Sequence, residues 1–350
     1  APSPSGGAQE LHKGGAGMKE RLILVTGATG YVGSVLVPLL ARKYPVRCFD
    51  TQHFGNSIAE IPNVEFLIGD IRDSSKCWQA LSGVTDVIHL AGIVTDELAD
   101  LNRRMTHEVN VIATHELLKQ AKVSGVERFL YASSSSVYGT RVEDATEEMF
   151  PAPMTFYAES KLAAERFVIF GNGPSFTTTA VRSATCAGPA PRMRLDTIVN
   201  VFSKQAYYDA FINVHDGTQW RSNIHVKDAA EFYIELLDKS IAHVGGEVFN
   251  ITGENYSAEE IALLAADVAK EWLHKAVEVR IDKSIRDERQ YRMSYAKAQL
   301  LLGWGPRRSM AKAIRENFDW FAAHPDMDVD SDLYYNTRRM REVVIKGAPW

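Results

Sequence analysis

A tyrosine and a lysine four positions apart, Tyr157 and Lys161, are the residues of this chain best suited to moving a proton. They open a helical pattern over Tyr157–Ile169, in which positions i and i+4 share one face. A cation beside a phenol favours the phenolate, so we expect the pKa of Tyr157 to fall from its usual value of about 10 toward the working pH. Such a tyrosine can act as general base and then as general acid. Because Tyr-x-x-x-Lys is common by chance, an amphipathic helix with a solvated lysine is the alternative for the pair taken alone.

A run of four serines, Ser133–Ser136, ends an apolar strand pattern upstream of the tyrosine. A serine at a strand end can hydrogen-bond both the tyrosine and a substrate hydroxyl or carbonyl. Serine runs are usually polar loops, and that alternative holds for this segment by itself. The serines, the tyrosine and the lysine nevertheless occur in the order that a proton-transfer site requires. We therefore predict a catalytic site where the serine run meets the start of the Tyr157 helix.

A glycine-rich turn near the start of the chain indicates a second site, one for phosphate groups. Gly27, Gly30 and Gly33 follow the apolar run Leu22–Val25 and precede a helical pattern. The first glycine permits a tight reversal, the second lets backbone approach a pyrophosphate, and the third lets the helix pack closely on the sheet. The N–H groups and the dipole of the new helix favour an anion there. The turn therefore predicts a dinucleotide-binding fold.

Asp50 ends the next apolar strand pattern, at the place where a carboxylate accepts hydrogen bonds from an adenosine ribose. A carboxylate at this position repels a 2′-phosphate, so Asp50 favours NAD over NADP. Arg47 lies nearby, but no arginine directly follows Asp50. We expect NAD to be the cofactor.

Alternating strand and helix patterns must position these segments. Parallel strands that are buried on both faces read as apolar runs, and ligands bind at their carboxyl ends. We predict a Rossmann-type doubly wound parallel sheet over residues 18–185, which residues 224–252 rejoin. Residues 186–223 and 253–350 would form a smaller mixed α/β substrate domain and a C-terminal tail. The strand runs are Leu22–Val25, Val46–Phe49, Val64–Ile68, Val87–Leu90, Phe129–Ala132 and Thr178–Val181, and the helical patterns include Val32–Lys43, Leu101–Val123 and Tyr157–Ile169.

Composition excludes several classes of partner. The chain has 350 residues and a formal net charge of −5, which gives no sign of nucleic-acid or membrane binding. Its three cysteines, Cys48, Cys77 and Cys186, are scattered, which argues against a disulfide framework or a zinc cluster and favours a reducing cytoplasm. No apolar run is long enough to span a membrane. Residues 1–17 resemble an added leader or linker.

A set of short motifs runs through residues 20–325. They are Thr26–Gly33, Gly69–Arg72, His89–Gly92, Asn110, the serine run with Val137–Gly139, Tyr157 with Lys161, Arg182, Gly188–Pro189, Arg221, Ile224–Asp228 and Leu302–Trp304. On these motifs the chain resembles the extended short-chain dehydrogenase/reductases of the NAD-dependent epimerase/dehydratase family. It is similar to nucleotide-sugar enzymes of the UDP-glucose/galactose 4-epimerase type.

The resemblance implies a role for individual residues. Ser134 would occupy the catalytic serine/threonine position, Tyr157 would exchange the proton, and Lys161 would also hold the nicotinamide ribose. Asn110 would support the active-site helix within the cofactor site, and Asp70 and Ile71 would contact adenine. The full set of implied cofactor residues is Gly27, Gly30, Tyr31, Val32, Gly33, Asp50, Asp70, Ile71, Ala91, Gly92, Asn110, Tyr157 and Lys161.

Departures from the family pattern narrow the reaction. The family's 4,6-dehydratases carry Asp-Glu directly after the catalytic serine or threonine, whereas this chain has Ser135 and Ser136. Elimination of water needs an acid/base pair beyond the tyrosine. Thr185 stands where many members have a sugar-binding asparagine, so the sugar pocket differs from that of a standard galactose epimerase. The predicted substrate residues are Ser135, Ser136, Thr185 and the diphosphate-binding arginines Arg194, Arg221, Arg286 and Arg289.

We therefore expect an NAD-dependent nucleotide-sugar epimerase that inverts C4 through a transient ketone. An NAD(P)H-dependent 4-ketoreductase is the first alternative, and a non-catalytic NAD-binding regulator is the second. We also expect a homodimer, because family members commonly pair the two helices that correspond to Leu101–Val123 and Tyr157–Ile169. The tail could instead cover the apolar residues that suggest this pairing, which are Leu117, Leu118, Phe167, Val168 and Phe170.

Overall fold

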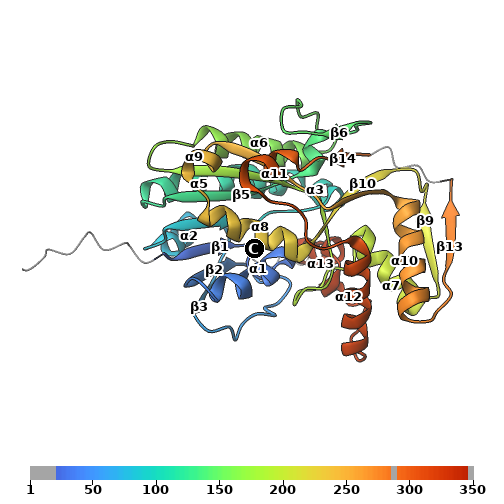
Figure 1. Cartoon of the computed structure of the whole chain (residues 1–350). Coiled ribbons are helices and arrows are strands. Elements are labelled where there is room, and N and C mark those ends of the chain that lie inside the picture. Colours follow the sequence, from blue (N-terminus) through green and yellow to red (C-terminus); the bar gives the residue numbers. More distant parts are fainter. Residues whose placement is uncertain (1–20, 285–289, 346–350) are drawn as a thin grey trace, which may run out of the picture.

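The sheet expected from the apolar strand runs is the centre of the computed structural model, which describes residues 21–284 and 290–345. Seven strands pair in parallel in the order β11-β7-β5-β4-β1-β2-β3. Figure 1 labels β1, β2, β3 and β5 of this sheet. This order reverses at β1, which places a ligand crevice at the carboxyl ends of the central strands. The strands are β1 Ile23–Thr26, β2 Val46–Asp50, β3 Val64–Ile68, β4 Asp86–His89, β5 Arg128–Ser134, β7 Thr177–Ser183 and β11 Glu247–Ile251.

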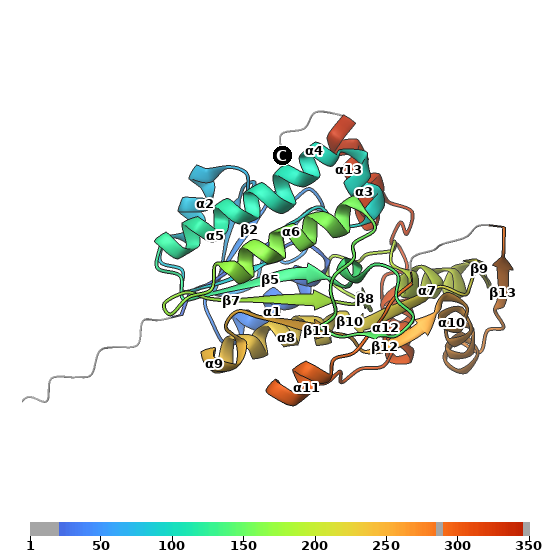
Figure 2. The ribbon, with the colours of Figure 1, turned by 90° about the horizontal axis from the view of Figure 1, so that it is seen from above.

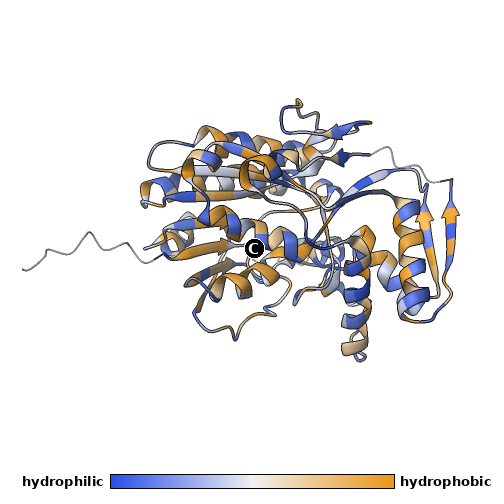
Figure 3. Ribbon diagram, in the orientation of Figure 1, coloured by the Kyte–Doolittle hydropathy of each residue, from blue (hydrophilic) through white to orange (hydrophobic). Residues whose placement is uncertain are grey.

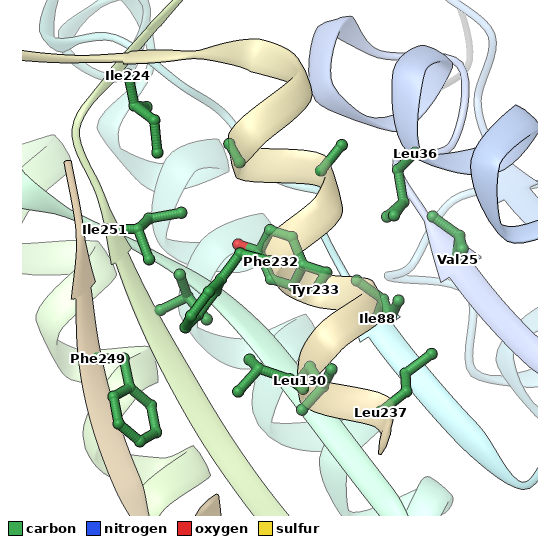
Figure 4. Packing of buried hydrophobic residues seen from close by; sticks show 14 of the residues in the cluster. Val25, Leu36, Ile88, Leu130, Ile224, Phe232, Tyr233, Leu237, Phe249 and Ile251 are labelled. Carbon is green, nitrogen blue, oxygen red and sulfur yellow. The ribbon is translucent and has the colours of Figure 1, made fainter. Parts of the chain in front are cut away.

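Side chains alternate across the sheet and build a separate core on each face. Ile23 and Val25 pack toward α1 (Tyr31–Ala41) and α8 (Val226–Asp238). Leu24, between them, packs toward the opposite face. That face is covered by α2 (Ser74–Leu81), α5 (Thr114–Val123) and α6 (Phe156–Phe170). Figure 4 shows the packing of α8 over the first face, and Figure 3 shows the apolar character of the central strands. The predicted doubly wound α/β fold is confirmed.

The helix expected over Leu101–Val123 is interrupted. α3 (Asp96–Leu101) ends at Asn102, whose side chain accepts a hydrogen bond from Met105 N and caps α4 (Arg103–His107). A π-helical turn, Glu108–Ala113, then joins α4 to α5. Such a wide turn inserts an extra residue into the helical ladder and is frequent at functional sites. The continuous 3.6-residue pattern gave no sign of either break.

A second lobe lies beyond the carboxyl end of the main sheet. Its core joins residues of α7 (Ile198–Tyr208), α10 (Ala258–Trp272) and α12 (Met310–Ala323). β8 (Thr185–Ala187) and β12 (Glu254–Ser257) flank β10 (Trp220–His225) in a three-stranded sheet, and β9 (Phe211–His215) pairs with β13 (Glu278–Asp282). The remaining described elements are β6 Asp144–Ala145 with β14 Arg292–Met293, the 3-10 turns Ser135–Tyr138 and Asp332–Tyr334, and the helices α9 Ile241–Val244, α11 Ala296–Leu302 and α13 Asn336–Ile345.

Two segments from the second half of the sequence return to the first domain. β11 pairs with β7 at the edge of the main sheet, and α8 packs on α1. α13 packs against α3, and its Met340 and Val343 join the core cluster that contains Leu98 and Phe129. The last described helix therefore reaches back over the nucleotide-binding half of the chain.

The apolar residues that suggested a second helix face divide into two groups. Leu117, Leu118 and Val168 are buried inside the chain, so the expectation that they form an outer face was wrong. Phe167 and Phe170 are exposed, at 38% and 86% of their surface. The buried group packs in the core cluster that α5 and α6 share with Phe129 and Phe176 on the sheet side.

None of the helices within the described ranges has the length and apolar character that a bilayer crossing requires. Cys48, Cys77 and Cys186 are free thiols.

Candidate active site

A cleft of about 1680 Å³ opens between the main sheet and the second lobe. The ends of β1, β2, β4 and β5 form one wall, as expected for the carboxyl edge of a parallel sheet. Residues of the second lobe form the other wall. The predicted residues that line the cleft are Gly27, Gly30, Tyr31, Val32, Gly33, Asp50, Asp70, Ile71, Ala91, Gly92, Ser134, Ser135, Ser136, Tyr157, Lys161, Thr185, Arg194 and Arg221.

The first two turns of α6 place Tyr157 and Lys161 in this cleft. Thr155 caps the helix by accepting a hydrogen bond from Ala158 N at 3.2 Å, and its hydroxyl donates to Asp96 Oδ1 at 2.5 Å. The cap fixes where the helix begins, and hence which face carries the pair. Lys161 is 4% exposed, and its Nζ lies 4.4 Å from the centre of the Tyr131 ring. A cation over an aromatic face partly compensates the loss of water.

Burial dominates the electrostatics of the pair. Desolvation raises the pKa of Tyr157 to about 12, against the lowering effects of its hydrogen bond to Ser134 and the charge of Arg194. The expected fall in this pKa is therefore wrong for the cofactor-free chain, because burial outweighs neighbouring cations. Desolvation also lowers the pKa of Lys161 to about 7, opposed by the carboxylate of Glu165.

Ser133 and Ser134 end the extended strand β5, where successive side chains point to opposite faces, and Ser135 and Ser136 begin a 3-10 turn. Ser134 turns toward Tyr157, and its Oγ also accepts hydrogen bonds from Ser136 N at 3.2 Å and Ser136 Oγ at 2.9 Å. Ser133 donates in another direction, to Glu165 Oε2 at 2.6 Å. Of these two serines, Ser134 is the one bonded to the tyrosine.

A buried ion pair fastens α6 to the sheet behind the site. Arg182 on β7 donates to both carboxylate oxygens of Glu165, with Nη2–Oε1 at 2.6 Å. Arg182 also donates to the hydroxyl of Tyr138, which in turn donates to Asn250. Glu165 lies one turn beyond Lys161, so this network fixes the part of α6 that carries the active-site pair.

Asn110 supports the site from outside the cleft lining. It lies on the π turn, and its amide accepts from Ile93 N at 2.7 Å and donates to Ile93 O at 2.9 Å. The same amide nitrogen donates to Ser160 Oγ at 3.0 Å. These bonds join the loop after β4 to α6, between Tyr157 and Lys161, so the structure gives Asn110 a supporting position.

The glycine turn has the shape of a cradle for a dinucleotide. Gly27 has a φ of +70°, and a Cβ there would lie 2.6 Å from Ala91 N. A Cβ at Gly33 would lie 2.4 Å from Gly27 O, so neither position tolerates a side chain. Asp50 accepts hydrogen bonds from Thr29 N at 3.0 Å and Gln52 N at 2.7 Å, which holds its carboxylate at the end of β2. The residues present fit a bound dinucleotide at this turn.

The residues at the other end of the cleft suit a polar, anionic substrate. Arg194 donates through Nε to Asp196 Oδ1 at 2.6 Å, which fixes the guanidinium within electrostatic reach of Tyr157. Arg221 extends from β10 and stacks 5.6 Å from the centre of the Tyr291 ring. Arg286 and Arg289 lie outside the described residues, as does the predicted leader over residues 1–17.

Sequence reasoning missed several residues that line the cleft. Asp96 raises the pKa of Tyr157, and Arg192 and Asn336 form a buried hydrogen bond at 2.6 Å. Asp96 begins the short helix α3 after β4, and Asn336 lies 140 residues from its partner Asp196. No periodicity or short motif marks such tertiary contacts.

The pKa of Lys161 gives a prediction for stability. Because folding lowers this pKa from 10.5 to about 7, the unfolded chain binds more protons between these values, and stability rises with pH there. The cost of the buried charge is fully present below about pH 7 and fades toward about pH 10. Lys161→Met should therefore raise the melting temperature of the cofactor-free protein at about pH 6, with a smaller gain at about pH 9.

Thermal unfolding across this pH range provides the measurement. Lys119→Met is the matched control, since Lys119 is exposed on α5 and pairs with Glu116 at 2.9 Å. Its effect should be small and nearly independent of pH. A Lys161→Met variant that is less stable than the parent at about pH 6 would contradict the buried-charge account.

Comparison with known proteins agrees with this geometry. Residues 23–252 match the model of the NAD dependent epimerase/dehydratase family. The chain is 26% identical over 337 residues to dTDP-D-glucose 4,6-dehydratase of Mus musculus, covering 91% of this chain and 93% of that protein. MoeE5, solved in complex with UDP-glucuronic acid and NAD, is 26% identical with a TM-score of 0.76, covering 86% of this chain and 99% of its own.

A second solved structure extends the comparison. UDP-glucuronic acid 4-epimerase from Bacillus cereus, in complex with UDP-glucuronic acid and NAD, is 25% identical with a TM-score of 0.74 and covers 86% of this chain and 99% of its own. The dinucleotide that fits the glycine turn is NAD, as expected from Asp50. Since the family model spans well over half of the sequence, the chain belongs to the NAD-dependent epimerase/dehydratase family.

Proposed function

We propose that this protein is a nucleotide-sugar epimerase that uses NAD to invert C4 of the sugar. The observation that carries the proposal is the composition of the cleft around Tyr157. Ser134 hydrogen-bonds the tyrosine, while the next two positions are the hydroxyl residues Ser135 and Ser136. Inversion through a ketone needs one proton shuttle, whereas elimination of water needs a further acid and base. Tyr157 would provide this shuttle, and the site has serines where the family's dehydratases have carboxylates.

Two observations support a nucleotide-diphosphate sugar as the substrate. MoeE5 and the Bacillus cereus epimerase were each solved in complex with UDP-glucuronic acid and NAD. In this chain Arg194 and Arg221 line the lobe side of the same cleft. Their guanidinium groups match phosphate oxygens in a bidentate arrangement. Thr185, Ser135 and Ser136 would provide hydrogen bonds to the sugar.

The proposed mechanism assigns each step to a side chain. Bound NAD supplies the reversible acceptance of a hydride from C4. Tyr157 takes the proton of the C4 hydroxyl and later returns it, while Ser134 hydrogen-bonds the same oxygen. Lys161 would hold the nicotinamide ribose, and Gly27, Gly30 and Asp50 would hold the rest of the dinucleotide. The planar ketone turns within the cleft before its other face is reduced, so one cofactor serves both halves of the reaction.

Proton exchange by Tyr157 can be tested by removing its hydroxyl. Tyr157→Phe keeps the ring and should lower turnover by about 10²–10⁴-fold with unchanged thermal stability, a typical contribution of a general acid/base. Ser134→Ala should cost less, because it removes one hydrogen bond. Ser133→Ala is the neighbouring control, since Ser133 bonds Glu165 rather than Tyr157. Near-normal steady-state turnover by Tyr157→Phe would refute the assignment.

Net consumption of the nicotinamide cofactor distinguishes the candidate reactions. An epimerase should convert many equivalents of UDP-sugar to the C4 epimer without added NAD, because its net redox change is zero. Nuclear magnetic resonance of the products and absorbance of the nicotinamide give the two readouts. Stoichiometric consumption of NADH with a keto-sugar would identify a reductase, and a 4-keto-6-deoxy product would identify a dehydratase.

We propose that the protein works as a homodimer in the reducing cytoplasm. Ile112, Phe167 and Phe170 leave an apolar surface beside α5 and α6, with 49%, 38% and 86% of their areas exposed. α13 packs on α3, so this part of the described tail does not cover that surface. Pairing of the two helices with those of a second copy would bury it and would brace α6 from behind.

Light scattering at micromolar concentration tests the dimer. The expected mass is twice that of the chain, and Phe170→Glu should shift it toward the monomer because a charge would be buried in the interface. Phe150→Glu is the control, since Phe150 is similarly exposed, at 79%, but lies in the loop before α6 and not on α5 or α6. A monomeric parent protein with full activity would overturn the proposal.

A further inference from the structure

Arg192 is a buried cation that the chain itself leaves incompletely bonded. The residue is 5% exposed, and among the described residues its Nε has no hydrogen-bond partner. Its Nη2 donates to Asn336 Oδ1 at 2.6 Å, and its guanidinium lies 4.0 Å from the centre of the Phe54 ring. Burial, with the charge of Arg194, lowers the pKa of Arg192 to about 10. A buried donor without a partner costs free energy, so such a group points to a ligand.

The carboxylates that act on Arg192 are already bonded to other groups. Asp196 accepts from Arg194 Nε through one oxygen and from Asn336 N, at 2.8 Å, through the other. Asp50 accepts from the backbone N–H of Thr29 in the glycine-rich turn and from that of Gln52 in its own loop. Neither carboxylate therefore accepts a hydrogen bond from Arg192 Nε. An anion from outside the chain could accept it.

Arg192 lies at the anion-binding end of α1. Its backbone N–H donates to Ser34 Oγ at 3.2 Å, in the first turn of that helix. Arg192, Tyr31 and Gly30 line the same cleft, and α1 begins directly after Gly30. The N-terminus of an 11-residue helix and a buried guanidinium thus face one volume. The anionic part of a dinucleotide in that volume is its pyrophosphate.

The C-terminal segment over residues 334–340 bonds Arg192 and also two loops, the one that contains Leu195 and the one after β2 that contains His53. Leu195 N donates to Tyr334 O at 2.9 Å, just before α13. Arg339 on α13 donates to His53 O at 2.7 Å, beside Phe54. Asn336, Thr337 and Met340 line the cleft. Figure 2 shows α13 beside α3, on the nucleotide-binding half of the molecule. The segment therefore joins the second lobe to the loop after β2 across the cofactor site.

We propose that Arg192 binds the pyrophosphate of NAD and that α13 closes over the same site, so that the two form a clamp that slows release of the cofactor. The clamp goes beyond the proposed reaction, because it concerns cofactor retention and holds for an epimerase or a reductase alike. In the clamp, Arg192 contacts the cofactor, Asn336 positions Arg192, and Arg339 fastens α13 to the loop after β2. The glycine turn alone would bind the cofactor more weakly.

Binding of NAD and of adenosine, which lacks the phosphates, tests the arginine. Arg192→Met keeps most of the volume over Phe54 and should weaken NAD by about 10- to 100-fold, the loss of a charge-assisted hydrogen bond, while adenosine affinity stays unchanged. Removing an incompletely bonded buried charge should leave the melting temperature of the cofactor-free protein unchanged or higher. Arg192→Lys keeps the charge but lacks the planar guanidinium, so its NAD affinity should lie between those of the parent protein and Arg192→Met.

Calorimetry of each variant decides the matter without an activity assay. Wild-type NAD affinity in Arg192→Met, or equal loss of NAD and adenosine, would overturn the pyrophosphate role. If Arg192→Met does not fold, the NAD affinity of Arg192→Lys is the test. Wild-type affinity in that variant would also overturn the pyrophosphate role.

The rate of NADH release tests the helix. In the full chain, Arg339→Met should speed the release measured by nicotinamide fluorescence several-fold, since it frees α13 from His53. Arg338→Met is the control on the same helix, because Arg338 stacks over Tyr335 and its hydrogen bond to Asp330 O is long, at 3.4 Å. Equal release rates in the parent and both variants would overturn the role of α13 in retention.

Discussion

The burial of Lys161 beside Tyr157 is the constraint on which the rest of the structure depends. An ammonium group at 4% exposure loses most of its hydration, and folding lowers its pKa to about 7. The Tyr131 ring and the carboxylate of Glu165 offset part of this cost. Glu165 is itself a buried charge, and its ion pair with Arg182 stabilises it. Breaking such a pair by removing one partner typically costs about 3–5 kcal/mol.

This chain of contacts explains why so much polar structure lies behind the site. The π turn brings Asn110 against Ser160, one residue before Lys161. Thr155 fixes the start of α6, and Arg182 fixes its middle against β7. The catalytic face of one helix is therefore fastened at three points to three different elements. A general base needs this precision, since its efficiency depends on geometry first and on pKa second.

The sequence predicted the sheet and the position of the glycine turn, because both rest on local signals. Buried parallel strands are apolar along their length, and a phosphate turn needs glycines at fixed spacing. The prediction failed where tertiary contacts decide. The break at Asn102 and the π turn follow from hydrogen bonds that a helical repeat does not encode. The pKa of Tyr157 rises because burial, which no spacing reveals, outweighs a neighbouring charge.

The C-terminal segment shows the same limit from another side. The composition of this segment predicted no function for it. In the structure, Asn336 and Arg339 donate hydrogen bonds to Asp196 and His53, which lie 140 and 286 positions earlier in the chain. A single cofactor that serves both halves of an inversion has to remain bound while the ketone turns. Arg192 and α13 provide contacts for that retention, and the glycine turn provides the cradle.

The central claim is that one tyrosine and one retained cofactor remove hydrogen from C4 and return it to the opposite face. A nucleotide sugar deuterated at C4 tests this claim most directly, with nuclear magnetic resonance and mass spectrometry of the product. The account predicts a C4 epimer that keeps its deuterium at C4, with no exchange from solvent. Loss of the label to solvent, or its appearance on another carbon of the product, would contradict the account.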